Sequence, residues 1–319
     1  MCTFMQADWS DDELVSLFDR VDNAGRWGPD DELGTLNYIT PVERRAAATL
    51  VRTGETMSLS LPLTGGQVEH QLRYHHDPGH PLRPPPSAGE HLSLDVHQPG
   101  LTHLDCVSHI GSHDGRVYTG RSFDAVATDA GLSHGSIYAQ RAGILSRGVL
   151  LDVAAACERD WLEPMHPISV AELEAAETVG NVRASRGDVV VVRSGSDARQ
   201  VALGPTPFSP GPAPEAIEWF HRREIAVYTG DAPERLTPAG ARILGLLPPG
   251  IPEPGPTRFP LPLHQIAIPA MGLVLLDHSF VEGLAQRCRQ LGRYEFMFVA
   301  APLALPGGTG SPVNPIAVF

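Results

Sequence analysis

The chain has 319 residues, of which 42% are hydrophobic and 19% charged, so it can bury a substantial core in one large domain or two modest ones. Its 37 acidic residues against 24 basic ones give a net charge of -13, and no dense Lys/Arg tract is present. This balance argues against nucleic acid or an anionic membrane as a partner.

The N-terminal segment lacks the basic region and apolar run of a signal peptide, and no stretch approaches the length and apolarity of a membrane span. The cysteines lie far apart and form no C-x-x-C pair; they are Cys2, Cys106, Cys157 and Cys288. We interpret them as reduced thiols and expect a cytoplasmic protein.

Two helices are expected near the N-terminus because each opens with a capping signal. Ser10 followed by Glu13 is a capping box, and apolar residues then recur at helical spacing. A second capping signal begins at Thr40, and its helix should end near Gly54. We predict that residues 1–24 form a helical extension and residues 25–319 one domain.

A strand is expected at 56–63, where apolar and polar residues alternate. Residues 65–90 contain the run YHHDPGHPLRPPPSAG and are predicted to form a long loop, because proline removes backbone donors and fixes φ. A loop of this length is more often functional than idle, and we interpret it as a lid over a site. Alternation at 92–97 then predicts a strand that leads into a cluster of His and Asp residues.

The rest of the chain alternates apolar runs with helical patterns. Strands are expected at 148–153, 188–193, 225–229, 272–276 and 296–301, and helices at about 169–179, 214–223 and 281–291. This mixture predicts a single α/β or α+β domain with a mixed sheet flanked by helices.

The stretch from Asp95 to Gly120 is dense in possible metal ligands. In an extended chain alternate residues face the same way, so His103 and Asp105 should point to one side. Imidazole and carboxylate suit Zn²⁺ or Mn²⁺, and such a site supports hydrolysis when one coordination position stays open. From spacing alone, these residues and His109 could equally form a hydrogen-bonded polar cluster.

Other polar groups along the chain have competing interpretations. The histidines at 75, 76 and 80 favour a solvated or substrate-facing loop over a second metal site. His113, Asp114 and Tyr118 could line a pocket or serve as caps and turns. Asp231 with Glu234 could be a catalytic pair or part of an Asp-Ala-Pro turn. The GGTGSP run at 307–312 lacks the lysine and following helix of a phosphate-binding loop.

Several motifs in one order resemble the Putative cyclase family, which includes bacterial kynurenine formamidases, isatin hydrolase and polyketide-associated cyclases. They are GRWGPDDELGTLNYITP at 25–41, the His/Asp cluster, RGVLLDVA at 147–154, GDVVVVRSG at 187–195, YTGD at 228–231 and PLALPGGTGSPVNPIAV at 302–318. The resemblance implies a swivelling β/β/α fold and a homodimer or homotetramer.

The resemblance also implies a divalent metal, zinc or manganese. It places His103 and Asp105 on metal-ligand positions and His109 on the position of a catalytic histidine, although His109 could instead orient a ligand. Farther along, His264 and Asp277 match additional ligand positions, with Asp277 in place of the more usual Glu.

One position departs from the family pattern. Pro99 stands four residues before His103, where the first histidine ligand is normally found, and proline cannot ligate a metal through its side chain. His97 lies two residues earlier and could substitute if the chain bulges there. Metal stoichiometry therefore stays open at this stage.

We expect a metal-dependent hydrolase that cleaves an amide, cyclic amide or lactone bond of a small molecule, with a histidine as acid and base. The predicted substrate contacts are His113, Tyr118 and Trp27. Two alternatives stay open: a cyclase or dehydratase acting on a polyketide or other biosynthetic intermediate, and a small-molecule binding protein that has lost metal catalysis.

Overall fold

A computed structural model describes residues 9–64, 68–82 and 84–319. Its helices are α1 (Asp11–Arg20), α2 (Pro41–Ala48), α3 (Phe123–Val126), α4 (Val153–Ala156), α5 (Val170–Gly180), α6 (Ser196–Leu203), α7 (Pro214–Arg223), α8 (Pro238–Ile243), α9 (Pro262–Ile266) and α10 (Glu282–Leu291). Shorter helical turns are η1 (Gly34–Tyr38), η2 (Tyr118–Gly120), η3 (Ile137–Gln140) and the π-helical η4 (Ala267–Met271).

The strands lie between these helices along the chain. They are β1 (Thr56–Ser58), β2 (Glu69–His75), β3 (Ser87–Ser93), β4 (His103–Asp105), β5 (Ala127–Thr128), β6 (Gly131–Leu132), β7 (Ile144–Asp152), β8 (Pro167–Ile168), β9 (Val189–Arg193), β10 (Gly211–Pro212), β11 (Val227–Gly230), β12 (Val274–Asp277), β13 (Glu295–Ala300), β14 (Gly310–Pro312) and β15 (Ile316–Val318).

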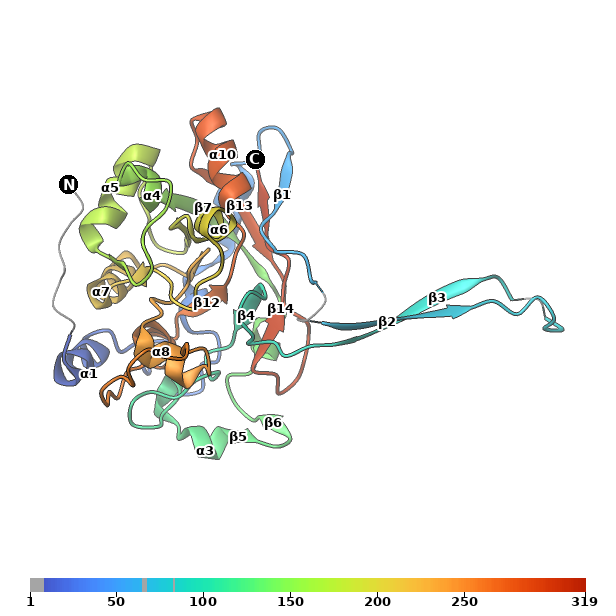
Figure 1. The fold of residues 1–319 in the computed structure, drawn as a ribbon, viewed down its shortest axis with the longest axis horizontal. Coiled ribbons are helices and arrows are strands. Elements are labelled where there is room, and N and C mark those ends of the chain that lie inside the picture. The colour runs from blue at the N-terminus through green and yellow to red at the C-terminus, as the bar shows by residue number, and fades with distance from the viewer. Residues whose placement is uncertain (1–8, 65–67, 83) are drawn as a thin grey trace.

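Within the described residues, nine strands form one curled mixed sheet in the order β1-β15-β13-β7-β9-β11-β12-β4-β14 (Figure 1). The central strands β7, β9, β11 and β12 run parallel, and both flanks are antiparallel. Because parallel strands need crossover connections, helices cover the sheet. The predicted α/β fold class with a mixed sheet flanked by helices is confirmed.

The central strands are apolar on both faces because both faces are buried. Along β9, Val190 and Val192 belong to one apolar core, and Val189 and Val191 belong to the other. Helices α1, α5, α7 and α9 contribute to the first core, and α10 contributes to the second. The continuous valine run in the sequence therefore reflects a strand buried on both sides.

The capping signals predict helix starts correctly. Complete capping boxes open α1 at Ser10, α2 at Thr40 and α5 at Ser169. Helix α2 ends at Ala48, before the expected end near Gly54. Helix α1 packs into the main core, and the predicted boundary between residues 24 and 25 stays a prediction.

The predicted loop at 65–90 is wrong at both ends, where β2 and β3 form, and right for the turn between them. Strands β2 and β3 pair along seven residues, from Glu69 with Ser93 to His75 with Ser87, and Figure 1 shows this hairpin extending away from the body instead of closing over it as a lid. The prolines lie in the turn between the strands, where no ladder hydrogen bond is lost. Residues 65–67 and 83 lie outside the described residues.

Two expected strands are shorter than the sequence pattern indicates. The strand expected at 56–63 ends at Ser58, and the strand expected at 92–97 ends at Ser93.

Among the described residues, no helix is long and apolar enough to cross a membrane.

Candidate metal centre

The predicted ligands of the His/Asp cluster meet where β4 lies between β12 and β14. His103 and Asp105 are the two ends of β4 and share a face, with His103 Nε2 3.6 Å from Asp105 Oδ1. The antiparallel register pairs Asp277 of β12 with His103. A strand far along the chain thus delivers a second carboxylate to the same place.

Helix α9 adds a third element to this cluster. His264 Nε2 lies 3.2 Å from Asp277 Oδ2 and 3.8 Å from Asp105 Oδ2. All three side chains are buried, with at most 8% of each residue exposed. Two carboxylates therefore face one another across an imidazole inside the protein.

His97 reaches the cluster from the segment that follows β3. Its Nδ1 lies 3.1 Å from Asp105 Oδ1, and its ring stacks on that of His109 with centroids 3.8 Å apart. Two groups of possible ligand atoms result, each within 4.8 Å of one another: His97 with Asp105 and His109, and His103 with Asp105 and Asp277. Asp105 belongs to both.

The donor set fits a cation. Within the described part of the chain, both Asp105 oxygens, Asp277 Oδ1 and His97 Nδ1 are buried without a hydrogen-bond partner. Buried polar atoms normally find one, because leaving them unpaired is costly. Oxygen and imidazole nitrogen atoms that converge in this way are the kind of ligands that hold a metal ion in proteins.

Three of the cluster histidines, His97, His103 and His264, have one nitrogen held by another group. His103 Nδ1 donates to the carbonyl of Leu101 at 2.8 Å, and His97 Nε2 lies 2.9 Å from Thr309 Oγ1. His264 Nδ1 lies 3.0 Å from Glu234 Oε2. The other nitrogen of each ring is left facing the carboxylates, which is the usual arrangement of metal-binding histidines.

Burial and neighbouring charges shift the pKa values of residues in the cluster. Burial raises the pKa of Asp105, but the charge that His109 carries when it is protonated at low pH and the contact with His97 outweigh burial, so this pKa lies below its ordinary value. Burial lowers the pKa of His109 to about 4, against an opposing effect of Asp105. His109 is therefore neutral near pH 7 and can accept a proton.

His264 shows the opposite shift. Burial alone would lower its pKa, but Asp277 and Glu234 on its two sides raise it well above the ordinary value. Burial also raises the pKa of Asp277, but the charge and hydrogen bond of His264 lower it more. The pKa of Asp277 therefore lies below its ordinary value. Carboxylates that favour a proton on His264 also attract a metal ion, so protons and metal compete for this nitrogen.

The sequence interpretation did not assign two residues to this cluster: Glu234, which it considered only as a partner of Asp231, and Thr309. Glu234 accepts hydrogen bonds from the backbone N–H of His264 at 3.1 Å and of Leu263 at 3.4 Å, in addition to the imidazole contact. Thr309 belongs to the GGTGSP run, and its hydroxyl orients His97. The acidic motif around residue 231 was the one signal for Glu234.

Asp231 does not pair with Glu234 as a catalytic couple. Its carboxylate instead accepts hydrogen bonds from the backbone N–H groups of Ser194, Gly195 and Ser196 at 2.7–2.8 Å. These bonds hold the turn that opens α6, a structural role that differs from both the catalytic pair and the Asp-Ala-Pro turn considered from the sequence.

The three predicted substrate contacts lie in packed surroundings. Tyr118 is fully buried and donates its hydroxyl to Asp31, and Trp27 packs edge-on against Tyr38. His113 lies against Phe259, with ring centroids 5.1 Å apart. Their substrate role stays a prediction.

Asp114 belongs to a turn. It accepts hydrogen bonds from Ser112 and from the Arg116 guanidinium, and together these contacts lower its pKa to about 2. A turn role, one of the two interpretations open from the sequence, accounts for these contacts.

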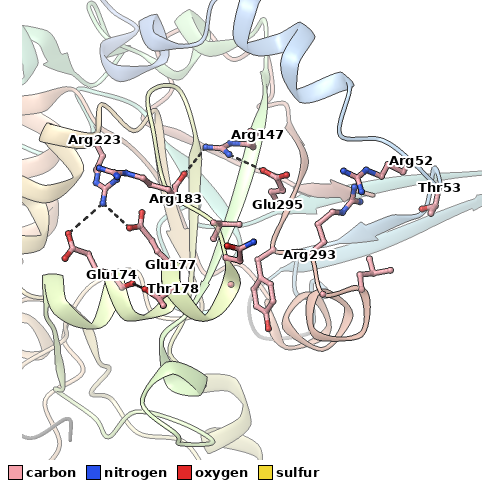
Figure 2. A pocket seen from close by; sticks show the side chains of 16 residues that line it. Arg52, Thr53, Arg147, Glu174, Glu177, Thr178, Arg183, Arg223, Arg293 and Glu295 are labelled. Carbon is pink, nitrogen blue, oxygen red and sulfur yellow. Dashed lines mark hydrogen bonds and ion pairs between the residues drawn. The ribbon is translucent and has the colours of Figure 1, made fainter.

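A surface pocket of about 1070 Å³ is lined by residues that do not belong to the His/Asp cluster (Figure 2). Its arginines are partly neutralised, since Arg147 pairs with Glu295, and Arg223 pairs with Glu177 and Glu174. None of the predicted site residues lines this pocket. The candidate site is therefore defined by the His/Asp cluster and not by this pocket.

The curled mixed sheet and the buried His/Asp cluster define an α/β protein with a candidate metal centre near one edge of its sheet. The family model described as "Putative cyclase" matches residues 57–234, and the chain belongs to this family. The matched span includes the segment that carries His97, His103, Asp105 and His109.

Solved structures share this fold. A structure described as a novel cyclase has 29% identity and a TM-score of 0.78, over 93% of this chain and 99% of that one. An isatin hydrolase bound to the product analogue thioisatinate has 19% identity and a TM-score of 0.53, over 87% and 96%. Isatin hydrolase A from Labrenzia aggregata, bound to benzyl benzoate, has 21% identity and a TM-score of 0.53, over 86% and 96%. No curated protein matches the chain.

Proposed function

We propose that the protein is a metal-dependent hydrolase that opens an amide, cyclic amide or lactone bond of a small molecule. The observation that carries this proposal is the orientation of the three histidines His97, His103 and His264. Each has one nitrogen engaged by an outer group and the other turned toward the buried carboxylates. A hydrogen-bonded polar cluster would not leave both Asp105 oxygens without a hydrogen bond when three imidazole nitrogens lie within 3.8 Å of them.

The proposed ligands are His97, His103, Asp105, His264 and Asp277, with zinc or manganese as the ion. His97 takes the part of the histidine that Pro99 replaces, because the chain brings its Nδ1 to 3.1 Å from Asp105. An ion held by such ligands acts as a Lewis acid toward a carbonyl and lowers the pKa of water. The two carboxylates offset the charge of a divalent ion.

His109 is the proposed acid and base. Its lowered pKa of about 4 keeps it neutral near pH 7, so it can take a proton from attacking water and return it to the leaving nitrogen or oxygen. Its ring stacks on that of His97, which fixes its plane beside the cluster. Its residue is half-buried, in keeping with the effect of burial on its pKa.

The similar isatin hydrolases favour a cyclic amide among the possible substrates. The family description and the structure described as a novel cyclase favour a second candidate, a cyclase that acts on a biosynthetic intermediate. The same residues would then move protons without net hydrolysis. Product analysis separates the two, since hydrolysis adds water to the substrate and cyclisation does not.

The test is hydrolysis of isatin, N-formylkynurenine and simple lactones by protein loaded with zinc or manganese. Asp105→Ala should lose metal and activity together, and His109→Ala should lose activity at full metal occupancy by about 100-fold or more. His80→Ala, an exposed histidine of the hairpin, is the matched control. Wild-type rates of hydrolysis in both site variants would contradict the proposed roles of Asp105 and His109.

A further inference from the structure

Five arginines and three glutamates line the surface pocket of about 1070 Å³. They are Arg52, Arg147, Arg183, Arg223 and Arg293, with Glu174, Glu177 and Glu295. The chain as a whole has the opposite balance, with 37 acidic residues against 24 basic ones. An excess of positive charge in a concave surface attracts anions and raises their local concentration.

Two of these arginines are held by carboxylates of the protein. Arg147 Nη1 lies 3.1 Å from Glu295 Oε2, and its Nη2 lies 2.6 Å from Asp188 Oδ2. Arg223 Nη2 lies 3.0 Å from Glu177 Oε2. The positive charge that is left over therefore belongs to the other three arginines.

Those three arginines have N–H groups that the described residues leave without an acceptor. Among the described residues, the side chains of Arg52 and Arg183 form no ion pair or hydrogen bond. Arg293 donates from Nη1 to the Leu50 carbonyl at 2.9 Å, and its guanidinium lies over the ring of Phe319, with 5.5 Å between Cζ and the centroid. That is the one hydrogen bond of this guanidinium within the described part of the chain, so its other N–H groups can bind a ligand.

Two of the three gather at one end of the pocket. The carbonyl that Arg293 binds lies two residues before Arg52, and Thr53 donates its N–H and its hydroxyl to the carbonyl of Phe319, whose ring Arg293 covers. Figure 2 shows Arg52, Thr53 and Arg293 at one end of the pocket, away from the paired Arg223. Arg52 and Arg293 are here called the arginine pair.

Other charges near the arginine pair offset only part of it. Helix α10 ends beside the pocket, and a helix C-terminus carries about half a negative charge. The closest acidic residues along the chain are Glu55 and Glu295. Each is already held by another arginine, Arg287 and Arg147 respectively. The arginine pair therefore keeps a net positive charge.

We propose that this pocket binds a phosphorylated small molecule, with the phosphoryl group on the arginine pair and the rest of the molecule extending toward the end formed by Arg223. A phosphate ester carries about two negative charges at pH 7, which matches two guanidinium groups. Each guanidinium can also donate two parallel N–H bonds to phosphoryl oxygens.

The size and the place of the pocket fit such a ligand. Small-molecule sites measure roughly 300–1,000 Å³, so a pocket of about 1070 Å³ has room for more than inorganic phosphate. No residue of the His/Asp cluster lines the pocket. The proposed site is therefore separate from the proposed hydrolytic centre and goes beyond its function.

The test is isothermal titration calorimetry of the purified protein with ribose 5-phosphate, with ribose as the comparison. The wild-type chain should bind ribose 5-phosphate and not ribose. Arg52→Gln should weaken binding about 10-fold or more, and Arg52→Gln combined with Arg293→Gln about 100-fold or more, because each change removes a charge-assisted contact with the phosphate. The matched control, Arg44→Gln with Arg159→Gln, removes two exposed arginines outside the pocket and should stay within about threefold at about 150 mM salt.

A further variant separates this site from the metal centre. Asp105→Ala should bind ribose 5-phosphate like the wild type, because Asp105 does not line the pocket. Thermal melting checks folding, and Arg52→Gln should melt like the wild type, since its side chain has no partner among the described residues. No binding by the wild-type chain, unchanged affinity in the double variant of the arginine pair, or loss of binding in Asp105→Ala would each overturn the proposal.

Discussion

Substituting Glu234 by Gln tests the role of the group that holds His264. The carboxylate accepts from His264 Nδ1 at 3.0 Å, from its backbone N–H at 3.1 Å and from that of Leu263 at 3.4 Å. Gln keeps the shape and one acceptor oxygen but removes the charge. His264 would then lose the charge-assisted hydrogen bond that directs its Nε2 toward Asp277.

The expected effect can be sized from the contacts. Removing an outer partner of a metal-binding histidine costs about 10- to 100-fold in metal affinity, which corresponds to roughly 1.4–2.8 kcal/mol. Glu234 and His264 are 7% and 8% exposed, so solvent screens this interaction little. The amide group that replaces one oxygen also faces donors, and should lower the free energy of unfolding by about 1–3 kcal/mol.

The assay is competition for Zn²⁺ against a chelator of known affinity, with thermal melting of the same samples. Glu253→Gln is the control, since this residue pairs with Arg242 on the surface and its side chain is 71% exposed. The control should bind Zn²⁺ like the wild type. A folded Glu234→Gln protein with wild-type affinity would refute the proposed orientation of His264.

Three further predictions follow from the same structure. A Cβ at Gly310 would lie 2.7 Å from His97 Cε1, so Gly310→Ala should weaken metal binding while Gly255→Ala, which has open space, should not; metal titration compares them. Burial first, and then the charge of Asp231, raises the pKa of Asp197 to about 7, so the native state keeps a proton that the unfolded chain releases. The free energy of unfolding should therefore fall as pH rises from about 4 to 7, and Asp197→Asn should flatten this dependence in urea titrations at several pH values. Zinc or manganese at 100 times its dissociation constant should add about 2.7 kcal/mol, so that a chelator lowers the melting temperature by several degrees; equal melting curves would contradict a native-state site.

Local patterns predicted much of the fold because their causes are local. The valine run of β9 and the capping box at Ser169 depend on neighbours within a few residues. The hairpin was missed for the same reason: prolines crowd its turn, and its strands alternate polar residues with few apolar ones. Its pairing of Glu69 with Ser93 spans a distance that no short window captures.

The residues of the candidate site also differ in whether local sequence patterns could predict them. Strand spacing alone placed His103 and Asp105 on one face, whereas His264 and Asp277 entered through the family resemblance. The approach of His97 depends on the path of the chain after β3, which the sequence pattern does not specify. Glu234 lies thirty residues before its partner His264, so only the folded chain shows the contact.

The most direct measurement of the central claim is anomalous X-ray diffraction from crystals grown with Zn²⁺ or Mn²⁺. We expect a peak about 2.0–2.2 Å from an Asp105 oxygen and from His103 Nε2, with His97 or His264 completing the site. Peaks confined to the exposed histidines of the hairpin, with none at Asp105, would contradict a metal centre in this cluster.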